Sequence, residues 1–358
     1  MNKELIIFNP SIEDGGVEKN LFLISNFFVN NNIKTTVISA DIVKKNYFDR
    51  KIKFFYPSKI NFKNSGRYKK YFFCLLLLAK KILFEKNILV FSFQANIYSI
   101  ILCKLLGAKV IVRLNTAPQG WYHNLIKKKI YNYIIKKADG VIVNSKYFQK
   151  EVKKRFGIKS IFINNPFDFK KIQKLSKIKV KKYYEKKDIK LIAVGRLTEQ
   201  KDHLTILKSM KILDEKKINF KLIIIGEGYL KPFLINFVKK NNLLKKIKFI
   251  GYKKNPFPII NQSDIFILSS LYEGSPNVLI EALFLQKNII STNCPTGPKE
   301  ILKNGKYGKL FGVQNYKDLT KKILYLSKKK GKKIPSIYFK NYEKDIICKK
   351  YKNYLIKF

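Results

Sequence analysis

The stretch Ser269-Ser270-Leu271-Tyr272-Glu273-Gly274-Ser275-Pro276-Asn277-Val278-Leu279-Ile280-Glu281-Ala282 follows the apolar run Ile265-Phe266-Ile267-Leu268. This order of residue types predicts a strand, a tight loop and then a helix. Ser275 is a suitable N-cap, and Pro276 suits the first helical position. The stretch therefore predicts an α/β unit in which a helix begins directly after a buried strand.

The start of that helix is predicted to bind an anion. The N–H groups of Asn277, Val278 and Leu279 have no partner within a new helix, and a phosphorylated ligand suits them. Glu273 precedes the helix, and Glu281 lies about 8 Å further along its axis at ~1.5 Å per residue. The two carboxylates are therefore placed to contact different ends of one ligand, and not to face each other as a general acid and base.

Length and cysteine content indicate a two-domain protein of a reducing compartment. The chain has 358 residues, more than the ~250–300 that a single core usually supports. Its four cysteines are scattered without a C-x-x-C pair, which argues against a disulfide framework and a zinc site. We expect a cytoplasmic location.

The apolar runs predict neither a signal peptide nor a transmembrane helix. The run near the N-terminus, residues 5–8, is too short for a signal peptide. The longest apolar run, residues 71–79, lies between lysine pairs and falls well short of the ~20 residues needed to span a bilayer.

The formal net charge of +50 has two explanations that do not exclude each other. A surface this basic suits nucleic acid or an anionic membrane. Only five of the 74 basic residues are arginine, and Lys, Asn, Ile and Phe are abundant, as an AT-rich genome would produce. A nucleic-acid-binding protein also needs a recognisable module with exposed aromatic residues. None is visible, so we expect no nucleic acid partner.

Apolar runs alternate with helical patterns along the whole chain, which is typical of parallel α/β sheets. The strands expected in the first half are residues 4–8, 34–39, 52–56, 87–91, 109–114, 140–144 and 160–164. Those expected in the second half are residues 189–194, 221–225, 247–250, 264–268 and 288–291. The lysine-rich segment 169–188 lacks regular apolar spacing and is predicted to link a domain of residues 1–168 to one of residues 189–337.

The spacing of Glu273 and Glu281 resembles the E-x7-E signature of the retaining glycosyltransferases of family 4. Further segments similar to that family, in the same order, are Gly15-Gly16-Val17-Glu18, Asn164-Asn165-Pro166-Phe167-Asp168, Ala193-Val194-Gly195-Arg196-Leu197-Thr198-Glu199-Gln200-Lys201-Asp202, Ile225-Gly226-Glu227-Gly228, Phe249-Ile250-Gly251-Tyr252 and Gly297-Pro298-Lys299-Glu300-Ile301. The resemblance implies the GT-B fold, with two Rossmann-like parallel-sheet domains facing across a cleft. It also implies an acceptor-side first domain, a nucleotide-sugar-binding second domain, and a final helix, about residues 338–358, that packs back on the first.

The expected catalytic residues are Arg196, Lys201 and Glu273. Transfer from a nucleotide diphosphate sugar requires the charge on the leaving diphosphate to be neutralised, and the chain has no Asp-x-Asp cluster to hold a metal for this. Arg196 follows a buried strand and can bind two phosphate oxygens, while Lys201 supplies a point charge. The resemblance implies that Glu273 contacts the donor sugar and Glu281 the ribose. We expect neither a metal nor another cofactor.

Other residues are expected on the donor side. The Gly15-Gly16 pair opens a helix after the first strand, where backbone N–H groups can approach a phosphate. Tyr252 is either a neighbour of the base or an ordinary core or surface tyrosine. The complete donor-side set is Gly15, Gly16, Gly195, Gly226, Gly228, Tyr252, Gly274, Ser275, Pro276, Asn277, Val278, Leu279 and Glu281.

The acceptor side departs from the family, because many members carry a histidine after the strand at residues 109–114 and this chain does not. Arg113 and Asn115 are the better candidates there. His123 could replace the imidazole only if its loop folds back, and His203 is interpreted as structural.

Two lysine-flanked segments are candidates for membrane contact. Residues 125–137 form a basic amphipathic pattern. The segment Lys69–Lys81 is apolar on all sides in its middle and is predicted to be buried against a sheet.

These features together predict a metal-independent hexosyltransferase of family 4. We expect it to transfer a sugar, from a UDP-sugar by preference, to a glycan or polyprenyl-linked acceptor during assembly of cell-surface polysaccharide such as lipopolysaccharide. It would lie peripherally on the inner face of the cytoplasmic membrane. The alternatives are a sugar-nucleotide epimerase of the same fold, which the scarcity of histidine disfavours, and a nucleic-acid-binding protein.

Overall fold

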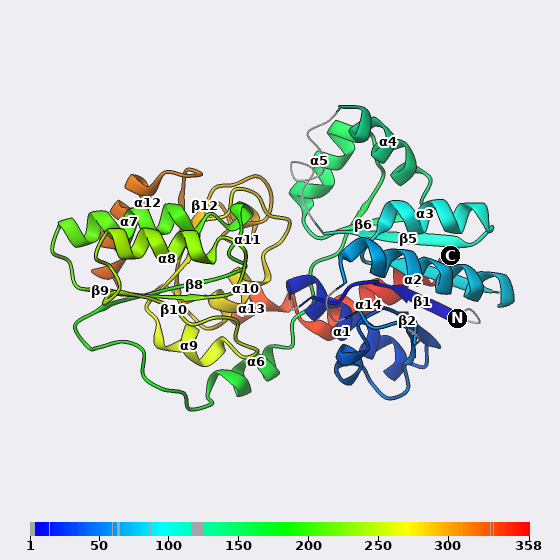
Figure 1. Cartoon of the computed structure of the whole chain (residues 1–358), viewed down its shortest axis with the longest axis horizontal. Helices are drawn as coiled ribbons and strands as arrows, with labels where there is room; N and C mark the ends of the chain where they lie inside the picture. Colours follow the sequence, from blue (N-terminus) through cyan, green and yellow to red (C-terminus); the bar gives the residue numbers. More distant parts are fainter. Residues whose placement is uncertain are drawn as a thin grey trace. The chain divides into compact units, whose positions relative to one another are not determined.

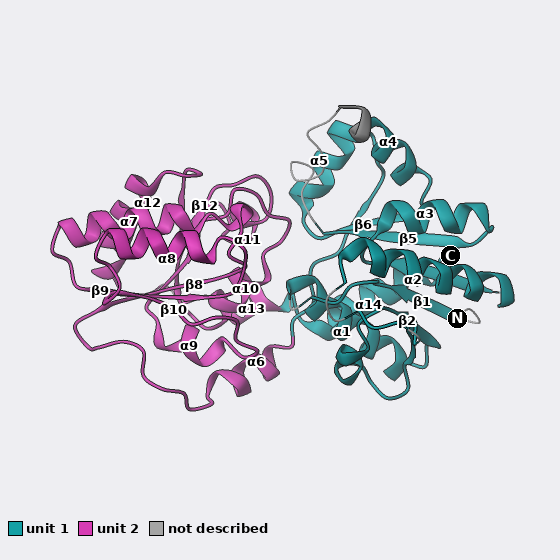
Figure 2. Ribbon diagram, viewed as in Figure 1, with its two compact units in different colours: residues 1–167, 340–358 teal, residues 168–339 magenta. Residues whose placement is uncertain are grey.

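The computed structural model describes residues 4–13, 15–58, 60–62, 65–85, 87–115, 125–329, 331 and 333–358. The chain divides into two compact units, shown in Figure 2. Unit 1 comprises Met1–Phe167 and Lys340–Phe358, and unit 2 comprises Asp168–Phe339.

Unit 1 is built on a seven-stranded parallel sheet in the order β3-β2-β1-β4-β5-β6-β7 (Figure 1). Its strands are β1 (Glu4–Phe8), β2 (Thr35–Ile38), β3 (Lys53–Phe55), β4 (Ile88–Ser92), β5 (Lys109–Leu114), β6 (Gly140–Val143) and β7 (Ile161–Phe162). The central strands β1 and β4 are buried along their whole length, as strands covered on both faces must be. The direction of strand order reverses between them.

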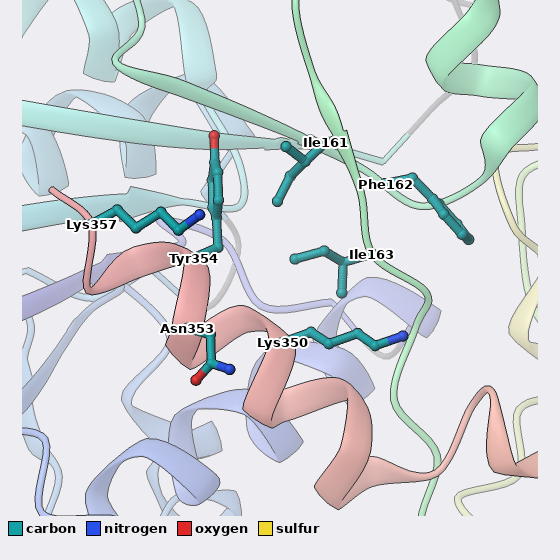
Figure 3. Close-up of a pocket in the computed structure, with 7 residues that line it drawn as sticks. All are labelled: Ile161, Phe162, Ile163, Lys350, Asn353, Tyr354 and Lys357. Carbon is teal, nitrogen blue, oxygen red and sulfur yellow. The ribbon is translucent and has the colours of Figure 1, made fainter.

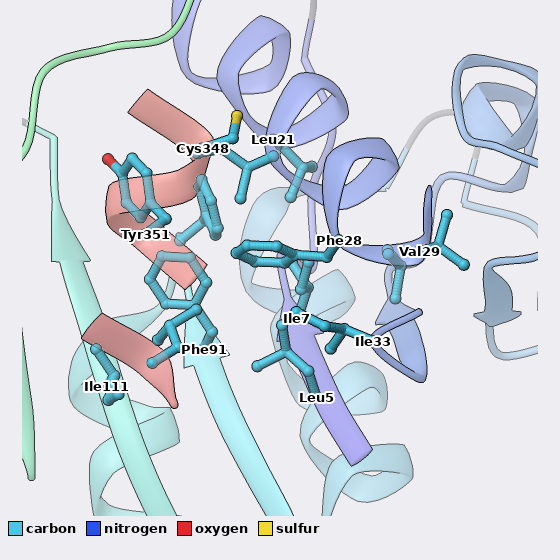
Figure 4. Packing of buried hydrophobic residues seen from close by; sticks show 14 of the residues in the cluster. Leu5, Ile7, Leu21, Phe28, Val29, Ile33, Phe91, Ile111, Cys348 and Tyr351 are labelled. Carbon is cyan, nitrogen blue, oxygen red and sulfur yellow. The ribbon is translucent and has the colours of Figure 1, made fainter. Parts of the chain in front are cut away.

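Two hydrophobic cores cover the two faces of this sheet. The helices of unit 1 are α1 (Gly16–Asn30), η1 (Ile42–Tyr47), α2 (Arg67–Phe84), α3 (Asn96–Leu105), α4 (Leu125–Lys136), α5 (Lys146–Phe156) and α14 (Lys344–Leu355). Side chains of α1 and α14, among them Phe28 and Tyr351, pack on one face (Figure 4). Side chains of α2, α3, α4 and α5, such as Leu78 and Ile100, pack on the other.

The C-terminal segment forms two short helices where the sequence predicts one. α13 (Ser336–Lys340) ends before the chain bridges to Phe167 at Glu343, and α14 begins at Lys344. The N–H of Phe167 donates to the carbonyl of Tyr342 at 2.8 Å, so these backbone bonds replace the continuous helix. α14 then packs against α1 within unit 1.

Unit 2 repeats the architecture with a six-stranded parallel sheet in the order β10-β9-β8-β11-β12-β13. Its strands are β8 (Ile189–Val194), β9 (Phe220–Ile225), β10 (Ile247–Phe249), β11 (Ile265–Leu268), β12 (Asn288–Thr292) and β13 (Lys309–Phe311). Every strand expected from the sequence is present. β13 was not expected, because it has only three residues between Gly308 and Gly312.

Helices cover both faces of the sheet of unit 2. A hydrophobic core fills one face beneath α7 (His203–Glu215), α8 (Lys231–Lys240) and α12 (Tyr316–Ser327). The remaining helices are η3 (Glu199–Lys201), α6 (Phe169–Ser176), α9 (Phe257–Gln262), α10 (Asn277–Phe284), α11 (Pro298–Ile301) and α13. The segment predicted as a linker thus begins with helix α6. Its Phe169 ring stacks on Phe284 at 4.6 Å and lies 5.4 Å from the ring of Phe339.

Within the described residues, none of the helices combines the length and apolar character needed to cross a bilayer. Helix α2, which contains the run predicted to be buried, is buried on one side only. Cys74, Leu78 and Lys81 face the core, whereas Phe72 and Leu76 are exposed. The run therefore packs against the sheet as predicted, while its other side is exposed because helices cover the sheet in a single layer here.

Candidate functional site

The loops that follow β8 and β11 form the best-defined candidate site. These two strands are neighbours at the point where the strand order of unit 2 reverses. In open α/β sheets, the loops after the carboxyl ends of such strands diverge and leave a crevice where ligands bind. The sequence stretches predicted to be catalytic follow these two strands.

Lys201 and Glu273 meet between the loops after β8 and β11. Lys201 ends η3, in the loop after β8, and its Nζ lies 2.5 Å from Oε1 of Glu273, in the loop after β11. Ser270 Oγ donates to the same carboxylate oxygen at 2.6 Å. Both charged side chains are largely buried, so their mutual attraction is screened less than that of a surface pair. The pair fixes one cation and one anion at the reversal point.

Further hydrogen bonds join the two loops. The N–H of Leu271 donates to the carbonyl of Gln200 at 2.9 Å, and Gln200 Nε2 donates to the carbonyl of Tyr272 at 3.0 Å. Ser269 Oγ donates to the carbonyl of Lys201 at 2.8 Å. The site is therefore held by backbone and side-chain bonds on both sides of the ion pair.

Glycines allow the neighbouring loops to approach closely. A Cβ atom on Gly226 would lie 1.9 Å from the carbonyl oxygen of Gly195, and one on Gly228 would lie 2.3 Å from that of Leu197. Gly226 also has a φ of 148°, which disfavours other residues. The predicted Gly-x-Gly turn after β9 thus packs against the loop after β8, and the space around both glycines is filled by backbone.

The helix after β11 begins one residue later than predicted. α10 starts at Asn277, with Pro276 in the N-cap position and without a side-chain cap. The Leu279 N–H donates to the carbonyl of Pro276 at 3.1 Å, so the expectation of three free N–H groups was wrong for Leu279. Ser275 precedes the cap and Val278 is half-buried.

The motif residues around α10 are mostly buried. Gly274, Asn277 and Glu281 are buried, and a Cβ on Gly297 would lie 2.6 Å from the carbonyl oxygen of Gly274. Gly297 has a φ of 62°. The loop after β12 therefore packs directly on the motif loop, which helps to fix the shape of the latter.

Two predicted residues of unit 2 are solvent-exposed. The Arg196 side chain is exposed just after β8, and Gly195 before it donates its N–H to the carbonyl of Ile225 at 3.0 Å. Tyr252 is also exposed, in the loop after β10. Both side chains are thus accessible to a ligand.

In unit 1, the Gly15-Gly16 pair also follows a strand at a reversal point. Gly15 is the N-cap of α1, and Gly16 is its first residue. The N–H of Ser11, in the same loop, donates to Oε1 of Gln94, in the loop after β4, at 2.9 Å. The loops after β1 and β4 are thereby joined, as those after β8 and β11 are in unit 2.

The structure gives Arg113 an interior position. Its side chain is fully buried; Nε donates to Tyr351 Oη at 2.9 Å, and Nη2 to Asn165 Oδ1 at 2.5 Å. A third bond joins Nη1 to Asn115, whose Nδ2 donates to the carbonyl of Phe93 at 2.9 Å. Arg113 therefore links α14 to the sheet. Its buried side chain is not accessible to an acceptor, although the sequence predicted it to lie on the acceptor side. His123 lies outside the described residues.

Burial controls the protonation of two groups near the ion pair. Burial, with Lys201 nearby, lowers the pKa of His203 to about 3, which keeps the imidazole neutral and agrees with a structural role. Burial, with a smaller contribution from Glu273, raises the pKa of Cys294 to about 12. The Cys294 thiol is thus not a nucleophile at neutral pH.

Sequence reasoning missed the residues that orient Glu273. Ser270 binds its carboxylate, and Thr296 Oγ1 donates to its backbone carbonyl. Ser270 stood inside the quoted motif, but its residue type alone gives no sign of its partner. Thr296 directly precedes Gly297, which begins one of the segments that resemble the family. That position was the one feature of the sequence that could have indicated Thr296.

A separate hollow of about 280 Å³ lies in unit 1 between β7 and α14 (Figure 3). It is lined by Ile161, Phe162, Ile163, Lys350, Asn353, Tyr354 and Lys357. None of the residues predicted to act on a donor or acceptor lines it. Among the described residues, no three His, Cys, Asp or Glu side chains gather as a metal site would require.

A model of a known protein family matches the second unit. Residues 176–344 match the family model described as glycosyl transferases group 1. Unit 2 is thus similar to group 1 glycosyl transferases over nearly its whole length. The Lys201–Glu273 pair and the glycine-rich turns lie inside the matched range, so this geometry belongs to the region that resembles those enzymes.

Two curated relatives each align with a little over half of the chain. An uncharacterized glycosyltransferase of Methanocaldococcus jannaschii is 38% identical over 206 residues, which cover 55% of this chain and 51% of that protein. The N-acetylgalactosamine-N,N'-diacetylbacillosaminyl-diphospho-undecaprenol 4-alpha-N-acetylgalactosaminyltransferase of Campylobacter jejuni is 28% identical over 228 residues, 61% of this chain and 60% of that one. The aligned region therefore spans about half to three fifths of each relative.

A solved structure resembles the whole chain. Anabaena HepE in complex with UDP and glucose has a TM-score of 0.77 with 14% sequence identity, and the likeness covers 100% of both chains. At that identity the likeness shows the fold alone. It confirms the prediction of the GT-B fold, with two Rossmann-like parallel-sheet domains.

Proposed function

We propose that this protein is a retaining, metal-independent glycosyltransferase of family 4. It would transfer a hexose or related sugar from a nucleotide diphosphate donor, a UDP-sugar by preference, to a glycan or polyprenyl-linked acceptor. The process it would serve is the assembly of cell-surface polysaccharide. The peripheral location, on the inner face of the cytoplasmic membrane, is part of the proposal.

The observation that carries the proposal is the Lys201–Glu273 pair between the loops after β8 and β11. An ammonium has three N–H donors, and the pair uses one of them. The others can bind diphosphate oxygens and neutralise the charge that grows as the sugar leaves. Arg196, exposed in the same loop after β8, would add a guanidinium fork to the same phosphates.

Glu273 would hold the donor sugar. Its Oε1 accepts bonds from Lys201 and Ser270, and a carboxylate has about four lone-pair directions, so capacity for sugar hydroxyls remains. Glu281, buried on α10, would accept from the ribose. Retention would then arise by attack from the face the diphosphate leaves, with the leaving group held in place by Lys201 and Arg196.

Support for the donor and acceptor classes comes from similar proteins. The HepE structure holds UDP and glucose, which favours a UDP-sugar. The C. jejuni relative acts, by its name, on a diphospho-undecaprenol-linked sugar, which favours a lipid-linked acceptor. These likenesses suggest the substrates to test first.

The experiment is release of nucleoside diphosphate from UDP-, GDP- and ADP-sugars, with and without lipid-linked acceptors extracted from membranes. We expect release from one donor, increased by the extract and unchanged by EDTA, with a product that keeps the anomeric configuration of the donor. Glu273→Gln should lose this activity. Glu215→Gln, an exposed glutamate paired with Lys211, is the matched control and should keep it. Absence of release from every donor would overturn the proposal.

A further inference from the structure

Apolar side chains are exposed to solvent on α2 and α3. The exposed large apolar residues of these two helices are Tyr68, Phe72, Leu76, Leu83, Phe84, Tyr98, Ile101 and Leu105. We call this surface the α2–α3 face. Single exposed apolar residues are ordinary on protein surfaces, but a contiguous set on adjacent elements marks an interaction site.

The residues of the α2–α3 face are contiguous because of helical spacing and helix packing. Tyr68, Phe72 and Leu76 follow one another at intervals of four, opposite the buried Cys74 and Leu78. α2 and α3 lie side by side (Figure 1), and the rings of Tyr71 and Tyr98 are 6.2 Å apart where the helices meet. The two apolar stripes therefore form one surface.

The charged side chains that α2 and α3 themselves contribute are all basic. Neither α2 nor α3 contains an aspartate or glutamate. Lys69 and Lys80 are exposed and extend the stripe of Phe72 and Leu76 at helical spacing. The neighbouring helix α4 is also free of acidic residues, and its Lys129 and Ile130 are exposed. A partner must offer an apolar layer together with negative charge.

We propose that the α2–α3 face docks on the surface of an anionic lipid bilayer. Leu76, Phe72 and their neighbours would enter the headgroup–acyl boundary, and the lysines would contact the acidic headgroups, as in interfacial basic amphipathic helices. A second copy of the chain fits less well, because a two-fold contact would place lysine-rich surfaces against each other. A bilayer supplies both the apolar layer and the opposite charge.

This inference deepens the proposed function and rests on the membrane location proposed there. It assigns the membrane contact to α2 and α3 and not to residues 125–137. Of the two candidate segments, the sequence favoured residues 125–137 for membrane contact and predicted that the α2 run is buried against the sheet. Among the side chains that the structure describes, α2 and α3 carry eight exposed large apolar residues, whereas α4 carries Ile130 and Tyr133.

The test is cosedimentation of the full chain with vesicles of phosphatidylcholine, with and without phosphatidylglycerol. The variant is Phe72→Ser with Leu76→Ser, whose side chains are 58% and 52% exposed. The matched control is Phe233→Ser with Leu244→Ser in unit 2, at 52% and 53% exposed. We expect the first pair to lower the partition coefficient on anionic vesicles at least about tenfold, because docking removes both side chains from water, and the control pair to leave it unchanged.

A second pair of variants tests the charge. Lys69→Gln with Lys80→Gln should weaken binding to anionic vesicles by about fivefold per lysine at low salt, and leave binding to neutral vesicles unchanged. Lys317→Gln with Lys321→Gln, both exposed on α12, should have no effect. An equal loss in the unit 2 controls would overturn the assignment to this face.

The remaining outcomes separate this inference from the proposed enzyme activity. Failure of the unaltered protein to bind anionic vesicles would overturn the docking proposal, whatever the donor-release assay shows. A dimer that Phe72→Ser with Leu76→Ser converts to a monomer would assign the face to a second copy and overturn it as well. Because vesicle binding needs neither donor nor acceptor, binding that follows the predictions without any sugar transfer would uphold docking and reject only the activity.

Discussion

Lys201 Nζ and Glu273 Oε1 lie 2.5 Å apart, although the two residues are 72 positions apart in the sequence. The pair joins the loops after the two strands that flank the reversal of strand order in unit 2. Each side chain therefore fixes the direction of the other, and both are positioned before any ligand binds. This preorganisation is what electrostatic stabilisation of a leaving group requires.

The first prediction concerns this pair. Glu273→Gln and Lys201→Met should each lower kcat for sugar transfer by about 10²–10³, the usual effect of removing one preorganised electrostatic group. Each single variant also leaves a largely buried partner charge, so thermal stability should fall in both. The double variant should be more stable than Lys201→Met alone, since it removes the orphaned carboxylate. Steady-state kinetics and calorimetry measure these effects; turnover near that of the unaltered protein in either folded variant would reject the site.

The second prediction separates Arg196 from the pair. Because the Arg196 side chain is exposed, Arg196→Ala should leave the melting temperature almost unchanged and still lower kcat by about 10² or more. Arg196→Lys should recover part of the activity, because lysine keeps the charge but loses the fork. Arg155→Ala, at an exposed arginine of α5, is the control. Equal activity of the Arg196→Ala and Arg155→Ala proteins would remove Arg196 from the mechanism.

The order of elements in both units could be predicted from the sequence because parallel strands buried on both faces read as unbroken apolar runs. Residues 4–8, 109–114 and 189–194 matched their strands to the residue. β13 was not predicted, because three residues between two glycines are too few to show an apolar strand pattern. The break between α13 and α14 was not predicted either. It is determined by backbone hydrogen bonds to Phe167, which is distant in the sequence.

The candidate site was predictable only in part. The motifs identified Lys201 and Glu273 individually as site residues. Their contact could not be predicted, because it depends on β8 and β11 being neighbours in the sheet. Arg113 shows the opposite case. Its position near the end of a strand suggested a residue on the acceptor side, yet its side chain is buried and bonds to the phenol of Tyr351, near the other end of the chain. No local pattern predicts such a partner.

The third prediction follows from that enclosure. Burial raises the pKa of Tyr351, so its phenol stays neutral and accepts the bond from Arg113 Nε. Tyr351→Phe should lower the free energy of unfolding of unit 1 by about 1–3 kcal/mol, because a buried guanidinium N–H loses its acceptor. Tyr184→Phe breaks a neutral bond to the carbonyl of Leu191 and should cost about 0.5–1.5 kcal/mol. Hydrogen exchange in α14 reports the first effect, and unchanged exchange would show that α14 does not depend on this bond.

The fourth prediction tests the close approach of the loops after β8 and β9. Gly226→Ala should unfold unit 2 or strongly lower its melting temperature, because its Cβ would lie 1.9 Å from the Gly195 oxygen and backbone cannot yield as a side chain can. Gly312→Ala meets only the Asn315 side chain, at 3.5 Å, and should be nearly neutral. Thermal melts followed by circular dichroism measure both. Similar melting temperatures for the two variants would mean that these loops are not in contact.

The fifth prediction concerns His203, whose pKa burial lowers to about 3 from an ordinary value of 6.5. The folded protein should therefore bind no proton at this imidazole between those values, while the unfolded chain does. It follows that His203 makes folding less favourable as pH falls from 6.5 toward 3. The chain has two histidines, so NMR can follow each. The imidazole signal lost in His203→Gln should not shift between pH 8 and pH 5; a midpoint near 6.5 for that signal would show that His203 is solvated and not buried.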